Sequence, residues 1–405
     1  MHIIERLQNT SIQYFAREAH PRTRLISDSS TPGSSASIAA SGFGFGANII
    51  AAERGVVTRD QAARETLEAL EFLAPLSING FFFHFLDPNT GERAGKSEVS
   101  TIDSAILFAG ALAAVEYFDR DNETERKIRI LGENLYLAAD WQWASPRAPA
   151  VAHGWTPEKG FLRYDWRGYN EALLLYVLAL GSSTYPVPRA AYDEWLSSYR
   201  WKSIYGYGLV YGGPLFVHQT AQSWIDFRGI RDGYMRERGI DYFENSRRAT
   251  YVHRTYAMRN PRGFSGYGEN CWGVSASTGP GSAKFHAYRA RGVPFGPDDG
   301  TIAPWTTAAS LPFAPEIVLP ALSHLEPMTQ TEHGVGACFN HTCTASPGSA
   351  GWTAGESYAI DHGPVVLMME NYRSALVWRL MRRSPHIRRG LERAGFTGGW
   401  LDQDS

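Results

Sequence analysis

The sequence has 405 residues, a formal net charge of −2 and no basic block, which argues against nucleic acid and anionic membranes as partners. Aromatic residues make up 13% of the chain, and such flat rings fill cores as readily as they bind the faces of sugars. The length exceeds the usual size of one core, although barrels and toroids of this length can form a single unit.

The cysteines and the first residues of the chain bear on its compartment. Cys271, Cys338 and Cys343 do not form a disulfide framework; Cys338 and Cys343 could pair, but we favour free thiols. No stretch approaches the length of a transmembrane helix. The first fifteen or so residues resemble the start of an amphipathic helix and not a signal peptide. We therefore expect a cytoplasmic protein, with a periplasmic one as the alternative if a signal has been removed.

Helices of modest length are predicted along the first part of the chain. They span 3–19, 38–53, 58–73, 98–118 and 122–139. An irregular loop is expected over 27–37, and a hairpin over 79–96 with the sequence PNTG at its turn. The GxGxG pattern at 42–46 is not a dinucleotide fingerprint, because no strand precedes it. Its small residues instead favour close packing of helices.

The second part of the chain alternates helices with longer loops. Helices are predicted over 171–180, 188–199, 215–237, 241–259, 315–325, 361–380 and 385–394. Loops rich in glycine and aromatic residues are expected over 153–165, 205–213, 263–304 and 333–358. Loops as long as the last two are usually functional when they occur inside a compact domain.

The recurrence of helix, short turn, helix and long loop indicates one all-α domain over residues 1–405. Strand patterns are few, no repeat of fixed period is visible, and no block of different composition marks a second domain. This rhythm is typical of paired helices arranged around an axis, with the long loops gathered at one end.

Glu171 opens the most apolar helix of the chain. The residues from Leu173 to Leu180 form an almost unbroken apolar run, typical of a helix buried on most sides, and Gly181 ends it. Trp166, Tyr169 and Asn170 precede the acid. An acid with such neighbours suits a site that cleaves sugars, but it could equally serve only the N-terminal end of its own helix.

Two further acids have settings of the same kind. Glu269 lies in the sequence GYGENCWG, and Asp361 lies in YAIDHGP at the start of a helix. Glycoside cleavage needs two carboxyl groups, one protonated to assist the leaving oxygen and one ionised. The three acids together therefore favour a glycosidase over a protein whose acids are only structural.

A second charged set is more simply explained as ion pairs that tie helices together. It comprises His218, Asp226, Arg228, Asp232, Arg236, Glu244, Arg247 and Arg248. At helical spacing Arg228 meets Asp232 and cannot meet Asp226. Metal ligation has little support, because neither HExxH nor paired His and Asp spacing occurs, and no GxSxG elbow or P-loop is present. We expect no metal and no cofactor.

Several segments in order along the chain resemble the bacterial β-1,2-glucanase family, whose members carry a glucoamylase-like domain. They are GYNEALLLYVLALGS at 168–182, GPLFVHQ at 213–219, WIDFRGIRD at 224–232, DYFENSRRAT at 241–250, GYGENCWG at 266–273, DHGP at 361–364 and ENYR at 370–373. The resemblance covers nearly the whole chain. His362 stands where the family pattern has Gln, which bears on local contacts in the sugar subsites.

The resemblance implies an (α/α)6 toroid with its cleft at one end, long loops and a small hairpin there, and hydrolysis of β-1,2-linked glucan of the endo type. It implies Glu171 as the general acid and Asp361 as the candidate base of an inverting reaction. The related transglycosylase domains of cyclic β-1,2-glucan synthases retain anomeric configuration, and in that case Glu269 would be the candidate nucleophile with Glu171 as acid/base. A non-catalytic glucan-binding protein is the remaining alternative.

The substrate expected from the resemblance is β-1,2-glucan or its oligosaccharides, and the oligomeric state stays open. The residues expected to stack on sugars, to contact hydroxyl groups or to support those contacts are Trp166, Tyr169, Asn170, His218, Trp224, Asp226, Arg228, Asp103, Arg93, Tyr267, Trp272, Trp305 and Trp352.

Overall fold

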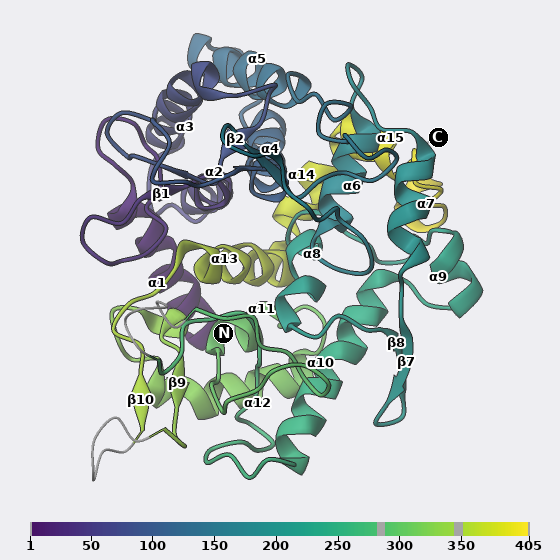
Figure 1. The fold of residues 1–405 in the computed structure, drawn as a ribbon. Coiled ribbons are helices and arrows are strands. Elements are labelled where there is room, and N and C mark those ends of the chain that lie inside the picture. The colour runs from purple at the N-terminus through teal and green to yellow at the C-terminus, as the bar shows by residue number, and fades with distance from the viewer. Residues whose placement is uncertain (1, 282–287, 344–350, 404–405) are drawn as a thin grey trace.

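The computed structural model describes residues 2–281, 288–343 and 351–403, and Figure 1 shows that helices dominate these segments. Parts of the two long predicted loops, 282–287 and 344–350, lie outside the described residues. The helices are α1 (His2–Glu18), α2 (Ile38–Glu53), α3 (Arg59–Leu73), α4 (Thr101–Tyr117), α5 (Glu123–Leu137), α6 (Ala172–Gly181), α7 (Arg189–Ser197), α8 (Thr220–Trp224), α9 (Gly233–Arg238), α10 (Tyr242–Arg259), α11 (Pro304–Ala309), α12 (Pro315–Leu325), α13 (Ala359–Ser374), α14 (Leu376–Arg383) and α15 (Pro385–Arg393).

The helices are arranged in groups above and below α13, which crosses the middle of the view in Figure 1. Helices α2 to α5 lie above it, and α10 to α12 lie below it. Helices α2 and α4 approach each other closely, since a Cβ at Gly110 would lie 2.2 Å from the carbonyl oxygen of Gly42. The small residues of the GxGxG segment therefore serve close helix packing, as the sequence predicts.

A buried charge network joins α13 to the first two helices. The Glu370 side chain is fully buried, and Arg54 Nε donates a hydrogen bond of 2.8 Å to its Oε2. Gln8 Nε2, from α1, donates to the same oxygen at 3.1 Å, and Arg54 also pairs with Oε1. Because the carboxylate is satisfied from two helices, this network fixes α13 against both α1 and α2.

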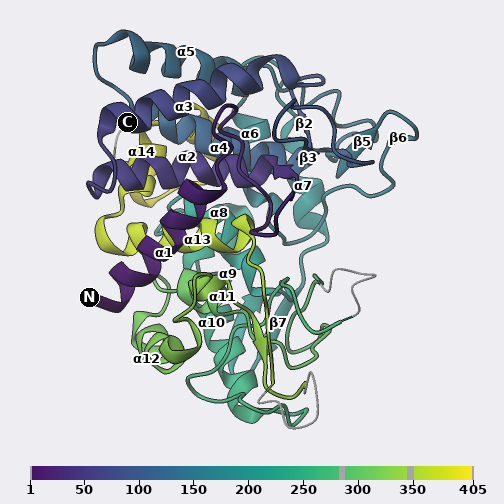
Figure 2. The same cartoon turned by 90° about the vertical axis from the view of Figure 1, so that its left-hand side faces the viewer.

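Short strands and loops gather on one side of the molecule, to the right in Figure 2. The strands are β1 (Ala36–Ser37), β2 (Phe82–Phe83), β3 (Phe85–Leu86), β4 (Val99–Ser100), β5 (Gly154–Thr156), β6 (Gly160–Phe161), β7 (Trp201–Ile204), β8 (Tyr207–Val210), β9 (Phe339–Asn340) and β10 (Trp352–Thr353). Among the described strands, β2, β4, β5 and β6 form the largest sheet, while β1 pairs with β3. The strand β4 leads directly into α4.

The loop over 27–37 is held against the start of α13 by backbone hydrogen bonds. The N–H of Ala359 donates to the carbonyl of Asp28 at 2.9 Å, and the N–H of Ser30 donates to the carbonyl of Ser357 at 3.0 Å. The N–H of Ser357 also donates to Ser30 Oγ, 327 positions away in the sequence. Residues far apart in the sequence therefore lie side by side on the side of the molecule where the loops gather.

Several predicted elements differ from the structure. The helix expected over 215–237 is broken into a 3-10 turn, α8 and α9, since Ile225 is extended and Asp226 begins a turn. The helix expected over 361–380 is interrupted at Ala375, whose φ of 56° is left-handed. Hydrophobic periodicity continues across such breaks and cannot reveal them.

Of two predictions about strands, one is confirmed in part and one is corrected. The hairpin predicted over 79–96 is present around the PNTG turn, where the N–H of Asp87 donates to the carbonyl of Glu92 and Leu86 bridges to Arg93, while β2 pairs with β4 and β3 with β1. The segment expected as a loop over 205–213 belongs in part to a true hairpin, β7–β8. No helix in the described part of the chain is both long and apolar enough to cross a lipid bilayer.

Candidate active site

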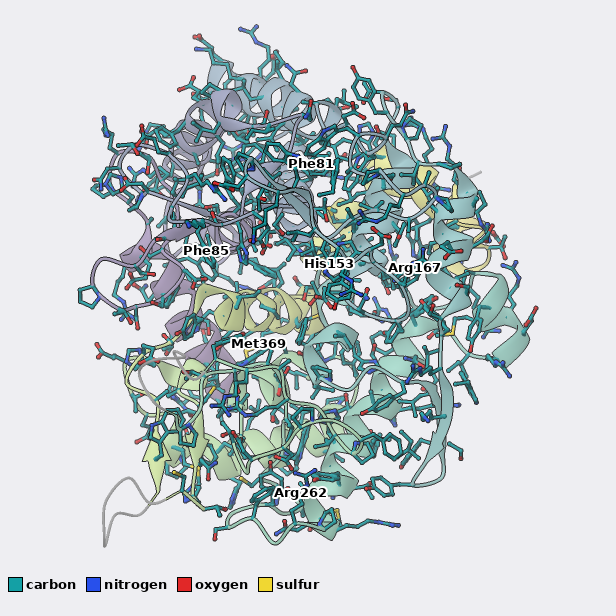
Figure 3. The ribbon with its side chains drawn as sticks, viewed as in Figure 1. Phe81, Phe85, His153, Arg167, Arg262 and Met369 are labelled. Carbon is teal, nitrogen blue, oxygen red and sulfur yellow. The ribbon has the colours of Figure 1, made fainter. Side chains whose placement is uncertain are left out.

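A cavity of about 670 Å³ lies where the loop over 27–37 meets the ends of several helices. This volume is within the range of small-ligand sites. Its lining residues are Asp28, Ser29, Thr31, Pro32, Gly33, Ser34, Ser37, Phe43, His84, Phe85, Ile102, Asp103, Ile106, Glu171, Phe216, Thr220, Ala276, Tyr288, Trp305, Tyr358, Ile360 and Pro364. In Figure 3, Phe85 lies between the upper group of helices and α13. The wall is mostly apolar or aromatic, with a few acids.

Glu171 lies at the N-terminus of α6 and faces this cavity. Its side chain makes no capping hydrogen bond to the helix and faces the cavity, which favours a role in the site over one confined to the helix end. Burial raises the pKa of Glu171 to about 7, with Asp103 raising it further and a backbone hydrogen bond opposing the shift. An acid with this pKa carries its proton over much of the neutral range.

Helix α6 is held rigidly behind the acid. Every residue from Ala172 to Gly181 is buried. Asn170 accepts hydrogen bonds from the N–H of Ala172 at 3.1 Å and from Trp195 Nε1 at 3.2 Å. The Trp166 indole donates to Thr101 Oγ1 at 3.0 Å. Asn170 therefore supports the start of α6 and Trp166 contacts the start of α4, and neither of these residues, which were predicted to touch substrate, lines the cavity.

Asp103 occupies the first turn of α4 and also lines the cavity. Ser100 caps this helix by accepting a hydrogen bond from the N–H of Asp103, and its hydroxyl donates to Asp103 Oδ2. The helix N-terminus favours an anion at this position. The prediction that Asp103 contributes to the site agrees with its place in the wall.

His84 lies between β2 and β3, and the sequence analysis did not identify it. Its N–H donates to the carbonyl of Glu98 at 2.7 Å, and its carbonyl accepts from the N–H of Ile38 at 3.1 Å, so both small sheets fix its backbone. Its ring reaches Glu98 at 3.0 Å and Asp103 at 3.6 Å. No periodic pattern marks a residue between strands of two residues each, which explains why it was missed.

Asp28 is the other cavity acid that sequence reasoning missed. It lies in the loop over 27–37, which the sequence analysis identified only as irregular. Burial raises the pKa of Asp28 to about 6; His84 opposes that rise and Asp103 adds to it. Asp28 also contributes to the raised pKa of Asp361 on the far side of the wall. The Ser, Pro and Gly residues of this loop, which indicate turns, were the only sequence signal near Asp28.

Asp361 is fully buried and does not itself line the cavity. Tyr288 does line it, and its hydroxyl donates a hydrogen bond of 3.5 Å to Asp361 Oδ1. Burial raises the pKa of Asp361 well above its usual value, and Asp28 adds to the rise. Among the described residues, Oδ2 of Asp361 has no hydrogen-bond partner. The Tyr288 hydroxyl therefore links the candidate base, Asp361, to the cavity.

Trp305 is the one tryptophan of the predicted binding set that lines the cavity, and its indole N–H has no partner among the described residues. Phe85, Phe216, Tyr288 and Tyr358 complete the aromatic wall. Such surfaces suit the apolar faces of a pyranose, and an unpaired indole N–H suits a hydroxyl oxygen.

Glu269 lies apart from the cavity acids. Its side chain is 62% exposed and pairs with Arg254 at 2.5 Å. It does not line the cavity, so the structure does not bring the nucleophile of the retaining alternative together with Glu171.

The other predicted binding residues also lie outside the cavity lining, because their side chains are used in packing or in ion pairs. Trp224 and Trp272 are buried in the core, and Tyr267 donates to Asp298 at 2.7 Å. Arg93 pairs with Glu158 at 2.5 Å. The remaining members of this group are Tyr169, His218, Asp226, Arg228 and Trp352.

One prediction about ion pairs is wrong. Asp226 and Arg228 were expected to be unable to meet, yet Arg228 Nη2 lies 2.7 Å from Asp226 Oδ2. The backbone turns after α8, so helical spacing does not apply there. Asp232 caps α9 and accepts from Tyr192 and does not pair with Arg228. The wider expectation of a structural ion-pair web agrees with Arg382, which also binds Asp226.

The chemistry of the site is that of carboxyl groups. Within the described segments, no group of three or more His, Cys, Asp or Glu side chains could hold a metal ion. The three cysteines are free thiols. The site presents a protonated acid, other carboxyl groups and an aromatic wall.

Known proteins resemble this chain in sequence and fold. Residues 163–385 match the family described as "Putative glucoamylase". A "putative glucoamylase" from Bacteroides uniformis is 33% identical, with a TM-score of 0.90 over 98% of each chain. An endo-β-1,2-glucanase from Chitinophaga pinensis, solved with sophorotriose and glucose, is 28% identical, with a TM-score of 0.88 over 98% of each chain.

A curated relative adds a second activity name. The exo-β-1,2-glucooligosaccharide sophorohydrolase (non-reducing end) of Parabacteroides distasonis is 28% identical over 96% of this chain. The chain spans 57% of that protein's length. Together with the solved structures, these likenesses confirm the all-α fold of the (α/α)6 type.

Proposed function

We propose, from the premise that this chain belongs to the family described as "Putative glucoamylase", that it is a glycoside hydrolase which cleaves β-1,2-linked glucan. The observation that carries the proposal is Glu171, a half-buried acid that faces a cavity large enough for sugar units, while the nearby Arg167 pairs with Glu194. Relatives named for β-1,2-glucan hydrolysis support the choice of linkage.

Glu171 acts as the general acid. Its pKa of about 7 keeps it protonated near neutrality, and its place in the cavity wall lets it reach a glycosidic oxygen. As the bond between the anomeric carbon and that oxygen breaks, the Glu171 proton passes to the oxygen and the leaving sugar departs as an alcohol.

Asp361 acts as the base of an inverting reaction, through the Tyr288 hydroxyl. A water molecule adds to the anomeric carbon, and the proton that it loses passes by way of Tyr288 to the Asp361 carboxylate. The raised pKa of Asp361 makes it a strong base once it is ionised. Trp305 and the other cavity aromatics hold the sugar rings.

The decisive experiment is incubation of the protein with linear and cyclic β-1,2-glucan, with product sizing and anomer analysis by NMR. We expect shorter β-1,2-linked products with inverted configuration. A relative is named as an exo enzyme and another as an endo enzyme, so product sizes will decide between these modes. Activity on another linkage and none on β-1,2-glucan would overturn the substrate assignment.

Glu171→Gln is expected to lower kcat by roughly 10²–10⁴-fold, because general acid assistance is worth about that much. The matched control is Glu269→Gln, on the surface beside Arg254, which is expected to leave kcat within about twofold. Loss of activity in both variants would support the retaining alternative, in which Glu269 is the nucleophile and Glu171 the acid/base. Wild-type binding of glucan without turnover would support a binding protein.

A further inference from the structure

We propose that Arg291 is a positioning residue of the reaction, which keeps the Tyr288 hydroxyl between the cavity and Asp361 by binding the backbone next to Tyr288. The inference rests on the proposed function, in which the proton lost by the water passes to Asp361 by way of Tyr288. Arg291 lies outside the cavity lining, so it acts through Tyr288 and not on the substrate.

Arg291 is a buried arginine that is paired with one carboxylate. Its side chain is only 2% exposed. Nε lies 2.8 Å from Asp299 Oδ1, and Nη2 lies 2.9 Å from Asp299 Oδ2, so the two side chains form a bidentate pair. A buried guanidinium is costly unless such partners satisfy it, and two parallel hydrogen bonds fix its orientation as well as its position.

The remaining nitrogen of the guanidinium binds the backbone. Nη1 donates to the carbonyl of Ser277 at 2.6 Å and to the carbonyl of Arg289 at 3.5 Å. Ser277 and Arg289 are themselves paired, since the N–H of each donates to the carbonyl of the other, at 3.1 and 3.0 Å. We call Ser277, Arg289, Arg291 and Asp299 the Arg291 clasp.

Each of the two paired backbone residues of the clasp directly follows a residue that lines the cavity. Ala276 precedes Ser277, and Tyr288 precedes Arg289. Consecutive Cα atoms are about 3.8 Å apart, so a movement of the pair is passed on to Tyr288. The Tyr288 hydroxyl lies 3.5 Å from Asp361 Oδ1, near the upper limit for a hydrogen bond, so a further shift of about 1 Å would break it.

The carboxylate end of the clasp is fixed by a helix and a strand. Asp298, the neighbour of Asp299, accepts a hydrogen bond of 2.9 Å from the Tyr256 hydroxyl of α10. Arg262, labelled in the lower part of Figure 3, donates to the carbonyl of Asp298 at 2.8 Å. Asn340, in β9, donates to the carbonyl of Asp299 at 2.9 Å. The clasp therefore connects the backbone beside Tyr288 to fixed parts of the fold.

The first test follows Tyr288 by fluorine NMR of protein labelled with fluorotyrosine. The Tyr288 signal is identified by its absence in Tyr288→Phe. In Arg291→Met we expect this signal to move toward that of a solvent-exposed fluorotyrosine, because the paired backbone beside Tyr288 has lost its donor. Asp299→Asn leaves the guanidinium without its carboxylate and should move the signal in the same direction, which provides the test if Arg291→Met does not fold. A Tyr288 signal that stays in place in a folded variant would overturn the inference.

The second test is a double-mutant cycle in kcat on β-1,2-glucan. Tyr288→Phe and Arg291→Met should each lower kcat by about 10²-fold, because a misplaced relay group costs about as much as a missing one. The variant that carries both changes should also lose about 10²-fold, since the hydroxyl that Arg291 positions is already absent. Losses that multiply to about 10⁴-fold would show independent effects and would overturn the positioning role.

The matched control is Arg247→Met, which removes another arginine paired with a carboxylate. Arg247 lies 2.9 Å from Glu316 and connects α10 to α12. Its replacement should leave the Tyr288 signal in place and kcat within about twofold of wild type. The same change of signal in this control would mean that the clasp has no special effect on Tyr288, which would overturn the inference.

These outcomes separate the inference from the proposed function. A wild-type protein without turnover on any β-1,2-glucan would overturn the proposed function, and the fluorine signal would still decide whether Arg291 holds Tyr288. Wild-type kcat in Tyr288→Phe would overturn the relay and the positioning role together. A loss of kcat in Tyr288→Phe, with full activity and an unmoved signal in Arg291→Met, would overturn the positioning role alone.

Discussion

At the scale of single residues, burial of Glu171 gives the site its reactive proton at the expense of folding stability. The carboxyl group is desolvated at the end of an apolar helix, and its pKa rises from an ordinary value of 4.5 to about 7. The folded protein therefore holds a proton that the unfolded chain has already released between these two pH values. The folded state is accordingly disfavoured where Glu171 must ionise.

This argument predicts a pH-dependent stabilisation by Glu171→Gln. The contribution of the raised pKa to stability is fully present below about pH 4.5 and is lost as pH rises through 7. Relative to wild type, the variant should gain about 1–3 kcal/mol of unfolding free energy between pH 4 and pH 8. Urea denaturation at both pH values measures this change. If the difference in unfolding free energy between the variant and wild type is the same at pH 4 and at pH 8, the prediction is wrong.

Residue by residue, the sequence identified the acids better than the surfaces that surround them. Glu171 was recognisable because it opens an apolar helix, and Asp103 because it lies in a first helical turn. Three of the seven aromatic residues expected at the sugar site, Trp166, Trp224 and Trp272, are instead buried outside the cavity lining. Composition cannot separate these uses, because a tryptophan ring fills a core as well as it binds a sugar.

At the scale of elements, the buried Glu370 carboxylate joins α13 to α1 and α2. Its burial is tolerated because Arg54 and Gln8 supply donors from two different helices. A buried carboxylate that loses its cation is left in an environment that cannot solvate it. The contact between these helices therefore depends on keeping both sides of the pair.

We predict that Arg54→Met destabilises the protein by about 3–5 kcal/mol at neutral pH, because it strands the Glu370 charge. The effect should shrink as pH falls and Glu370 becomes protonated. The matched control is Lys127→Met, which breaks the exposed pair with Glu123 on α5 and should leave the stability close to that of wild type. Chemical denaturation measures both values. Equal losses of stability in the two variants would show that the buried pair contributes no more than the exposed one.

Most helices were predictable at this scale, whereas their interruptions were not. Periodicity located α2, α4, α6 and α10, because each carries a buried stripe or is apolar throughout. The break between α8 and α9 depends on the turn at Asp226, whose carboxylate binds Arg228 and Arg382. Arg382 belongs to α14, far from Asp226 in the sequence, so a local sequence pattern cannot reveal this contact.

At the scale of the whole molecule, the all-α architecture followed from the rhythm of helices and loops. The position of the cavity did not, because its wall combines the loop over 27–37 with residues as distant as Pro364. Asp28 and His84 acquire their roles only through this assembly, and no separation along the sequence indicates that they meet.

The overall charge gives a prediction for the reaction with glucan. The chain carries a net charge of −2, and a glucan is neutral, so long-range attraction contributes nothing to their encounter. We expect kcat/KM at the pH optimum to change by less than about twofold between 50 and 500 mM NaCl. Initial rates on β-1,2-glucan at graded salt measure this. A steep decline would indicate a charged substrate.

The hydrogen bonds from Ser357 and Ala359 to Ser30 and Asp28 have a consequence for biosynthesis. When translation has passed Glu171 but not reached Ser357, the loop that carries Asp28 is held by earlier residues such as Tyr14 and lacks its contacts with the start of α13. A nascent polypeptide halted before residue 357 would thus contain the acid yet lack a closed pocket, and catalytic competence would arise only after Ser357 and Ala359 have been added.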